Sequence, residues 1–181
     1  MKTLYLVRHG ESQANADKVV AGGALDSPLT ELGRSQAHEV AQQVRDLYFD
    51  VFISSTMLRA VDTADIIAAE IGWSRGIERD SRLIELRAGE ATNSPIHDYH
   101  ERLRRGDVIP GAETLGEMYD RVREFLAEIA KRPERSFLIV SHNGTGKMIL
   151  SVIHDGIPND FLTIPDQRNG EVVEVKLHEA A

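Results

Sequence analysis

Two arginines and two histidines in this sequence have types and positions that suit phosphate chemistry. Arg8 and His9 follow the first apolar run of the chain, His142 follows the run 137–140, and Arg59 comes a few residues after the run 51–53. Arginine presents a planar fork of N–H donors that matches phosphate oxygens. A neutral imidazole nitrogen can attack phosphorus and hold the phosphoryl group covalently. The residue types therefore predict phosphoryl transfer, with His9 as the nucleophile and the other three side chains supplying charge and hydrogen bonds.

The elements that must position these side chains follow from the hydrophobic pattern. Apolar runs typical of strands alternate with segments of helical periodicity. We expect strands, or extended chain, at 3–7, 51–53, 82–86, 137–140 and 171–177. Helices are expected from Thr30 to about 47, over 57–71, from Thr114 to 129 and over 144–153. This alternation predicts an α/β fold, a three-layer sandwich with a mostly parallel central sheet and helices on both faces.

In such a sheet, ligands bind beyond the carboxyl ends of the strands. The arginines and histidines above all follow strand ends, so the fold would gather them at one edge of the sheet. We expect these side chains to surround a common hollow of the size of a phosphoryl group.

Composition limits what the protein can bind. The chain has 181 residues, of which 41% are hydrophobic and 28% charged, and its formal net charge is −8. We expect one domain spanning residues 1–181. We do not expect such an acidic chain to bind nucleic acid or an anionic membrane through non-specific electrostatic attraction. Because the sequence contains no cysteine, disulfides and thiolate chemistry are excluded. No signal-peptide pattern opens the chain, so we expect a cytoplasmic protein.

Several motifs together resemble the histidine phosphatase superfamily, the phosphoglycerate mutase-like group. They occur in the family's order along nearly the whole chain: LVRHGES (6–12), PLTELG (28–33), SSTMLRA (54–60), RLIE (82–85), GAET (111–114) and VSH (140–142). The resemblance implies the same α/β sandwich as the periodicity. It also implies an enzyme that needs neither a metal nor another cofactor.

The resemblance assigns catalytic roles to five residues. His9 would carry the phosphoryl group, while Arg8, Arg59 and His142 would cradle it. Glu85 would protonate the leaving oxygen and then activate water as a base. From the residues alone, Glu85 could equally be a surface carboxylate paired with a nearby arginine, Arg82 or Arg87.

A second set of residues stands where the family contacts phosphate or substrate. Ser12 and Asn15 follow the first histidine, and Gly22 and Gly23 occupy a place where mutases tend to have Thr-Gly. Asn143 replaces the glycine that usually follows the second histidine. That replacement leaves open the shape of the far wall of the phosphate pocket. Glu11, the other nearby carboxylate, is expected to orient the loop or an arginine.

Two departures from the mutase pattern favour hydrolysis. Ala88 stands where mutases typically have tyrosine, and the lid-like segment of about 88–111 is short. A mutase must protect its phosphoenzyme from water, whereas a small lid suits attack by water. We therefore expect a phosphomonoesterase acting on a small phosphorylated metabolite. A phosphoglycerate mutase-type phosphotransferase, a phosphoprotein phosphatase and a catalytically silent binding module are the alternatives, and a homodimer is left open.

The lid segment carries two clusters of charged side chains that could be read as binding sites. One contains His97, Asp98, His100 and Glu101, whose spacing fits a solvated helix face better than a metal site. The other contains the arginines at 102, 104 and 105, which fit surface charge better than a subsite for a second anionic group.

Overall fold

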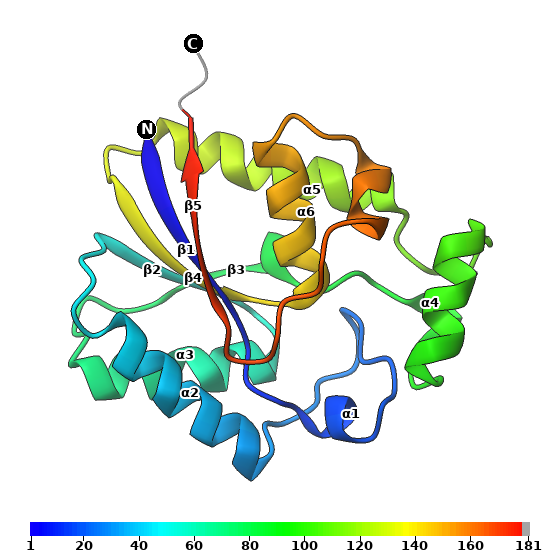
Figure 1. Cartoon of the computed structure of the whole chain (residues 1–181), viewed down its shortest axis with the longest axis horizontal. Helices are drawn as coiled ribbons and strands as arrows, with labels where there is room; N and C mark the ends of the chain where they lie inside the picture. The colour runs from blue at the N-terminus through cyan, green and yellow to red at the C-terminus, as the bar shows by residue number, and fades with distance from the viewer. Residues whose placement is uncertain (179–181) are drawn as a thin grey trace.

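The central element of the computed structural model, which describes residues 1–178, is a five-stranded sheet of order β3-β2-β4-β1-β5 (Figure 1). Its strands are β1 (Lys2–Arg8), β2 (Val51–Ser55), β3 (Glu78–Asp80), β4 (Ser136–Ser141) and β5 (Val172–Leu177). The first four run parallel, and β5 pairs antiparallel with β1 at one edge. Every residue of β2 and β4 is buried, as expected for parallel strands that are covered on both faces.

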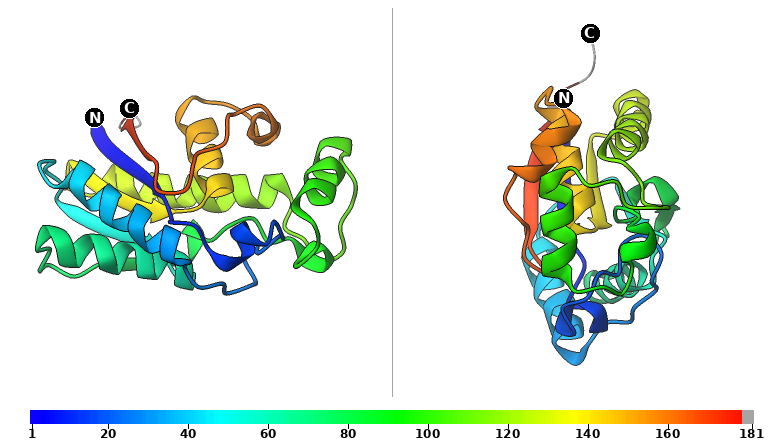
Figure 2. Two further views of the ribbon diagram at one scale, coloured as in Figure 1. Left: turned by 60° about the horizontal axis from the view of Figure 1, so that its bottom comes forward. Right: turned by 90° about the vertical axis from the view of Figure 1, so that its right-hand side faces the viewer.

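Helices cover both faces of this sheet, which confirms the predicted three-layer α/β sandwich (Figure 2). Two of them, α2 (Glu31–Val44) and α3 (Leu58–Ile71), pack on one face, and α5 (Leu115–Lys131) and α6 (Asn143–Ile153) pack on the other. Two further helices are α1 (Gln13–Ala16) and α4 (Ile96–Arg105). Short 3₁₀ turns are η1 (Ser81–Leu83), η2 (Gly89–Ala91) and η3 (Pro158–Leu162).

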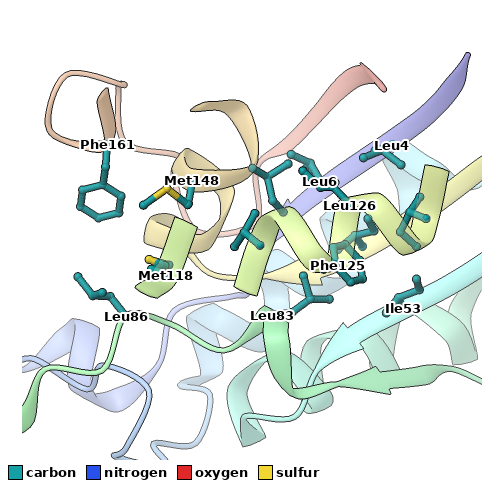
Figure 3. Packing of buried hydrophobic residues seen from close by; sticks show 14 of the residues in the cluster. Leu4, Leu6, Ile53, Leu83, Leu86, Met118, Phe125, Leu126, Met148 and Phe161 are labelled. Carbon is teal, nitrogen blue, oxygen red and sulfur yellow. The ribbon is translucent and has the colours of Figure 1, made fainter. Parts of the chain in front are cut away.

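Alternation along the strands builds a separate apolar layer on each face. Leu4 and Leu6 of β1 point toward α5, where they join Phe125 and Leu126 (Figure 3). Val7 of β1 points the other way and packs with the buried residues of α2 and α3. Successive side chains of a strand alternate between the faces. Apolar packing on both faces therefore holds the strands and fixes the position of their carboxyl ends.

Local sequence signals set most helix boundaries. The Thr30 hydroxyl accepts a hydrogen bond from the Gly33 amide at 3.0 Å and caps α2. Thr114 and Glu117 form a capping box at the start of α5. Gly72 adopts a φ of 69° and ends α3 in the left-handed conformation.

Residues 82–86 form no strand of the sheet: Arg82 and Leu83 belong to η1, and the chain becomes extended at Ile84. The strand is β3 and ends at Asp80, where its partner β2 also runs out of residues to pair. The Asp80 carboxylate then accepts a hydrogen bond from the Arg82 amide at 2.8 Å and starts η1. Loss of the neighbouring strand, together with this side-chain cap, turns the chain away from the sheet.

No helix within residues 1–178 is both long enough and apolar enough to cross a membrane. At the carboxyl ends of the parallel strands, α1 and α4 lie at the same end of the molecule (Figure 1). The connections that follow β1, β2 and β4 open toward this end.

Candidate active site

The register of the sheet brings the predicted arginines and histidines together. Arg8 of β1 is paired with Ser141 of β4, so the residues that follow them, His9 and His142, emerge side by side. Their ring centroids are 5.0 Å apart, in an edge-on arrangement. Arg59, from the first turn of α3, reaches the same point and donates a hydrogen bond to His9.

The His9 ring is held in one tautomer. Its Nδ1 lies 2.6 Å from the Gly10 carbonyl oxygen, which can only accept, so Nδ1 carries the hydrogen. Nε2 therefore has a free lone pair, and Arg59 Nε donates to it at 3.1 Å. Burial, with the charges of Arg59 and Arg8, keeps the pKa of His9 well below its ordinary value of 6.5. His9 is consequently a neutral imidazole with its unprotonated nitrogen directed at a guanidinium.

Arg59 is fixed by backbone oxygens and forms no ion pair with a carboxylate within residues 1–178. Its side chain lies almost wholly inside the protein, with 2% of its surface exposed. Nη2 donates to the Gly22 carbonyl at 2.9 Å and Nη1 to the Leu25 carbonyl at 3.2 Å. Gly22 has a φ of 53°, and a Cβ there would lie 2.9 Å from the Leu86 carbonyl oxygen. The tight glycine turn thus presents a carbonyl that helps to aim this guanidinium at His9.

Two buried polar atoms beside His9 have no partner within the described chain: Nε of Arg8 and Nδ1 of His142. The remaining contacts of both side chains are defined. Arg8 Nη1 donates to the Gln167 carbonyl at 2.5 Å, and His142 Nε2 lies 2.9 Å from the Ser55 hydroxyl. Because an unpaired buried polar group costs free energy, these two atoms are poised for a polar group that is bound next to His9.

Glu85 is held by two backbone amides, one of the next residue and one at the start of α6. Its two carboxylate oxygens accept hydrogen bonds from the Leu86 amide at 2.9 Å and the Gly144 amide at 3.0 Å. A Cβ at position 144 would lie 2.3 Å from the Glu85 carboxylate, so only glycine leaves room for it. The alternative of a pair with Arg82 or Arg87 is not observed, since those arginines contact Asp80, Glu128 and Glu113.

A cavity of about 600 Å³ opens onto these groups. Arg8, His9, Arg59 and Glu85 line its inner end. Of the other residues proposed to touch phosphate or substrate, three line it: Asn15, Gly22 and Asn143. The remaining two do not line it: Ser12, which is fully buried and caps α1, and Gly23, which is half-buried. His142 is buried, and its ring packs edge-on against the His9 ring.

Asn143 determines how the far wall of the phosphate pocket is built. Its amide donates to Asp166 Oδ1 at 2.9 Å, and its Oδ1 accepts from the Gln167 amide at 2.9 Å. The start of α6 is thereby tied to the segment that also orients Arg8 through the Gln167 carbonyl. Sequence reasoning missed Gln167, because no local pattern marks it and its role depends on a contact with residue 8.

Glu11 behaves as a loop-orienting residue. Its carboxylate accepts a hydrogen bond from the Thr30 hydroxyl at 2.8 Å, and its amide donates to Gln36 Oε1 at 2.7 Å. Asn169, which lies shortly before β5, donates a side-chain hydrogen bond to the His9 carbonyl at 3.0 Å. The backbone around His9 is therefore fixed from two distant parts of the chain.

The segment 88–111 contains α4, which forms one side of the cavity through Ile96, Tyr99, His100, Leu103 and Arg104. The cluster of acids and histidines on α4 does not converge: the His97 side chain is 75% exposed and lies 3.6 Å from Asp98 and 3.8 Å from Glu101. Residues 1–178 include no group of three or more acidic or histidine side chains able to hold a metal ion.

Burial of the two histidines makes the stability of the fold dependent on pH. Burial, followed by the charges of Arg59, His9 and Arg8, also keeps the pKa of His142 well below its ordinary value. Below about pH 6.5 the unfolded chain binds protons at His9 and His142 that the folded chain does not bind, so stability falls as the pH falls through this value. Each histidine contributes a loss of about 1 kcal/mol between about pH 7 and about pH 5.5.

Urea unfolding followed by fluorescence of the single tryptophan, Trp73, measures this dependence. We expect the free energy of unfolding to decrease over that pH range, and His142→Gln to remove about half of the decrease. His97→Gln, at a side chain that is 75% exposed, provides the control for replacement of a histidine outside the core. An equal slope in wild type and His142→Gln would show that folding does not lower the pKa of His142.

Comparison with known proteins agrees with this geometry. Residues 4–181 match the histidine phosphatase superfamily (branch 1). A relative called "Probable phosphoglycerate mutase GpmB" in Salmonella choleraesuis is 38% identical over 170 residues, covering 87% of this chain and 77% of that protein. The structure of Bacillus stearothermophilus YhfR is 26% identical with a TM-score of 0.84, over 97% of this chain and 91% of that one. The alpha-ribazole phosphatase of Shigella flexneri, at 22% identity, shares the fold with a TM-score of 0.85, over 98% and 91% of the two chains. The chain belongs to the histidine phosphatase superfamily.

Proposed function

We propose that this protein hydrolyses phosphate monoesters of small metabolites through a phosphohistidine on His9, without a metal ion. One observation carries the proposal: the unprotonated Nε2 of a neutral His9 faces the guanidinium of Arg59 in a cavity that opens to the surface. That combination offers a nucleophile and a fixed positive charge at the same point. Arg8 and Arg59, supplied by the chain itself, would stabilise the phosphoryl oxygens.

In the first step, His9 Nε2 attacks phosphorus and the P–O bond to the alcohol breaks. The proton carried by the Glu85 carboxylic acid passes to the departing oxygen, which leaves as a neutral alcohol. The phosphoryl oxygens would accept hydrogen bonds from Arg59 Nε, which now donates to His9 Nε2, and from Arg8 Nε and His142 Nδ1. The two buried atoms that have no partner within the described chain would thereby gain one.

In the second step, a water molecule attacks the phosphorus and the P–N bond to His9 breaks. Glu85, now a carboxylate, takes a proton from that water, and inorganic phosphate leaves. The net reaction consumes one ester and one water and releases one alcohol and one phosphate. His9 and Glu85 return to their starting forms.

The segment 88–111 is proposed to act as a short lid over the alcohol part of the substrate. An isolated β-bridge between Ala88 and Ala112 closes the two ends of the segment, and α4 places both apolar and charged side chains at the cavity. The cavity is far larger than a phosphoryl group, so it has room for the alcohol of a small metabolite.

A mutase that transfers the phosphoryl group back to a second hydroxyl is the second candidate. The name of the relative from Salmonella choleraesuis favours it. The two reactions differ in the fate of the phosphoenzyme: hydrolysis releases inorganic phosphate, whereas a mutase returns the group to its substrate and needs a bisphosphorylated primer. Addition of such a primer should leave phosphate release unchanged if the protein is a phosphatase.

Phosphate release over a panel of phosphomonoesters, with and without chelator, tests the proposal. We expect release from at least one small sugar, sugar-acid or nucleoside phosphate, at the same rate in the presence of chelator. Activity lost on chelation and restored by a divalent ion would contradict the metal-free mechanism. Isomerisation without phosphate release would favour the mutase.

Glu85→Gln should slow esters unequally. A departing oxygen of low pKa needs little help from an acid, whereas an alkyl alkoxide needs much. We expect kcat/KM to fall by roughly 10²-fold for an alkyl phosphate and by much less for 4-nitrophenyl phosphate. Equal slowing of both esters would remove Glu85 from the role of general acid.

A further inference from the structure

A buried ion pair lies directly behind the segment that carries Glu85. Arg121 of α5 donates from Nε to one oxygen of Glu113 at 2.6 Å and from Nη2 to the other at 2.9 Å. The side chain of Glu113 is 3% exposed and that of Arg121 12% exposed. Since desolvation offsets much of the attraction within a buried pair, stability alone is a weak reason for its presence.

The pair holds the Glu85 segment on both sides. Arg121 Nη1 donates to the Arg82 carbonyl at 2.5 Å, and Nη2 is 3.5 Å from the Glu85 carbonyl. Beyond Glu85, the Arg87 amide donates to the Glu113 carboxylate at 3.3 Å, and the Glu113 amide donates to the Arg87 carbonyl at 2.9 Å. One guanidinium and one carboxylate therefore fix the backbone before, at and after Glu85.

Two other hydrogen bonds secure the residues just before Glu85 to the site. The Ser141 hydroxyl donates to the Leu83 carbonyl at 2.8 Å, and the Thr145 hydroxyl donates to the Ile84 carbonyl at 2.7 Å. These bonds hold the chain against β4 and α6 but do not reach Glu85 or Arg87. The Leu86 carbonyl accepts a hydrogen bond from the Gly23 amide at 3.2 Å, and the Glu85 carboxylate accepts hydrogen bonds from the Leu86 and Gly144 amides. Glu113 and Arg121 add the side-chain contacts to the backbone of Arg82, Glu85 and Arg87.

We propose that Glu113 and Arg121 are positioning residues for Glu85, which set the place of its carboxyl group relative to the leaving oxygen; this inference rests on the proposed function. A proton-transfer group works only within hydrogen-bond reach of its target, so small displacements of Glu85 reduce the rate. Loss of the pair should therefore weaken acid catalysis while leaving the nucleophile His9 and its arginines in place.

Arg121→Lys tests the proposal without leaving Glu113 as an uncompensated charge. A lysine ammonium cannot bridge both oxygens of Glu113 and the two carbonyls as a planar fork does. We expect kcat/KM to fall about tenfold for an alkyl phosphate and to stay within about twofold for 4-nitrophenyl phosphate. Glu113→Gln should give the same pattern, and it stands in for Arg121→Lys if that variant does not fold.

A double-variant cycle separates positioning from a general structural effect. In the Glu85→Gln background, Arg121→Lys should cause no further change in the ratio of the two kcat/KM values. The matched control is Arg132→Lys. Arg132 donates four hydrogen bonds to Glu78 and Glu134, and these bonds involve none of residues 82–87. This variant should leave the ratio unchanged.

The outcomes distinguish the two proposals. If Glu85→Gln slows both esters equally, Glu85 is not the general acid of the proposed function, and the positioning role of Glu113 and Arg121 is overturned as well. If Glu85→Gln is selective for the alkyl ester but Arg121→Lys and Glu113→Gln slow both esters alike, only the positioning role is overturned. It is also overturned if the selective effect of Arg121→Lys persists in the Glu85→Gln background.

Discussion

Replacement of His9 by glutamine is expected to reduce phosphate release by about a thousandfold or more, because it removes the unprotonated ring nitrogen that would accept the phosphoryl group. The neighbouring imidazole of His142 is buried, and its Nε2 lies 2.9 Å from the Ser55 hydroxyl. Glutamine keeps a side chain of similar length but has no nucleophilic nitrogen. Steady-state assays with the best ester of the panel measure the effect.

Fluorescence of Trp73 provides the folding control for His9→Gln. This residue packs against Phe49 and Phe52, in the apolar layer between the sheet and the α2 and α3 helices, away from His9. An unchanged emission spectrum and a cooperative unfolding transition would show that the variant is folded. A folded His9→Gln protein with more than about a tenth of wild-type activity would exclude His9 as the covalent nucleophile.

Arg59→Lys is expected to lower kcat by about 10²- to 10³-fold, the usual effect of losing a fixed donor to transition-state charge. The guanidinium of Arg59 makes three hydrogen bonds at once, to His9 Nε2 and to the carbonyls of Gly22 and Leu25. A lysine cannot make all three, so its charge would not be held against the phosphoryl oxygens.

The matched control for Arg59→Lys is Arg123→Lys, on the exposed side of α5. Its side chain is 63% exposed and contacts only Asp120 among the ion pairs of the described chain. This control should retain full activity, whereas Arg59→Lys should lose kcat for good and poor leaving groups alike. A loss confined to poor leaving groups would assign Arg59 to protonation of the alcohol instead of to phosphoryl charge.

The sequence was sufficient to predict the layers of the fold, because local patterns determine them. The apolar runs that became β1, β2 and β4 are bounded by polar residues, and Thr30 and Thr114 carry their capping signals with them. Residues 82–86 join no strand for a non-local reason: β3 ends where β2 ends. A strand needs a neighbour, and a single sequence does not show where that neighbour stops.

The site followed from the sequence to the extent that it lies at strand ends. Arg8, His9 and His142 needed only the parallel pairing of β1 with β4 to come together. The supports of the site depend on contacts between residues far apart in the chain, such as Gln167 with Arg8 and Arg121 with the Glu85 segment. Neither residue has a local pattern that marks it. Long-range packing decides such contacts, so they become visible only in the fold.

Chemical identification of the phosphoenzyme examines the role of His9 without reference to any one substrate. The protein is mixed with a substrate of the panel, denatured in base after a few milliseconds, digested and analysed by mass spectrometry. Phosphohistidine is stable in base and labile in acid, so a phosphoryl group on His9 that disappears after acid treatment is the expected result. A phosphoryl group on any other residue, or turnover with no labelled enzyme under these conditions, would contradict the proposed mechanism.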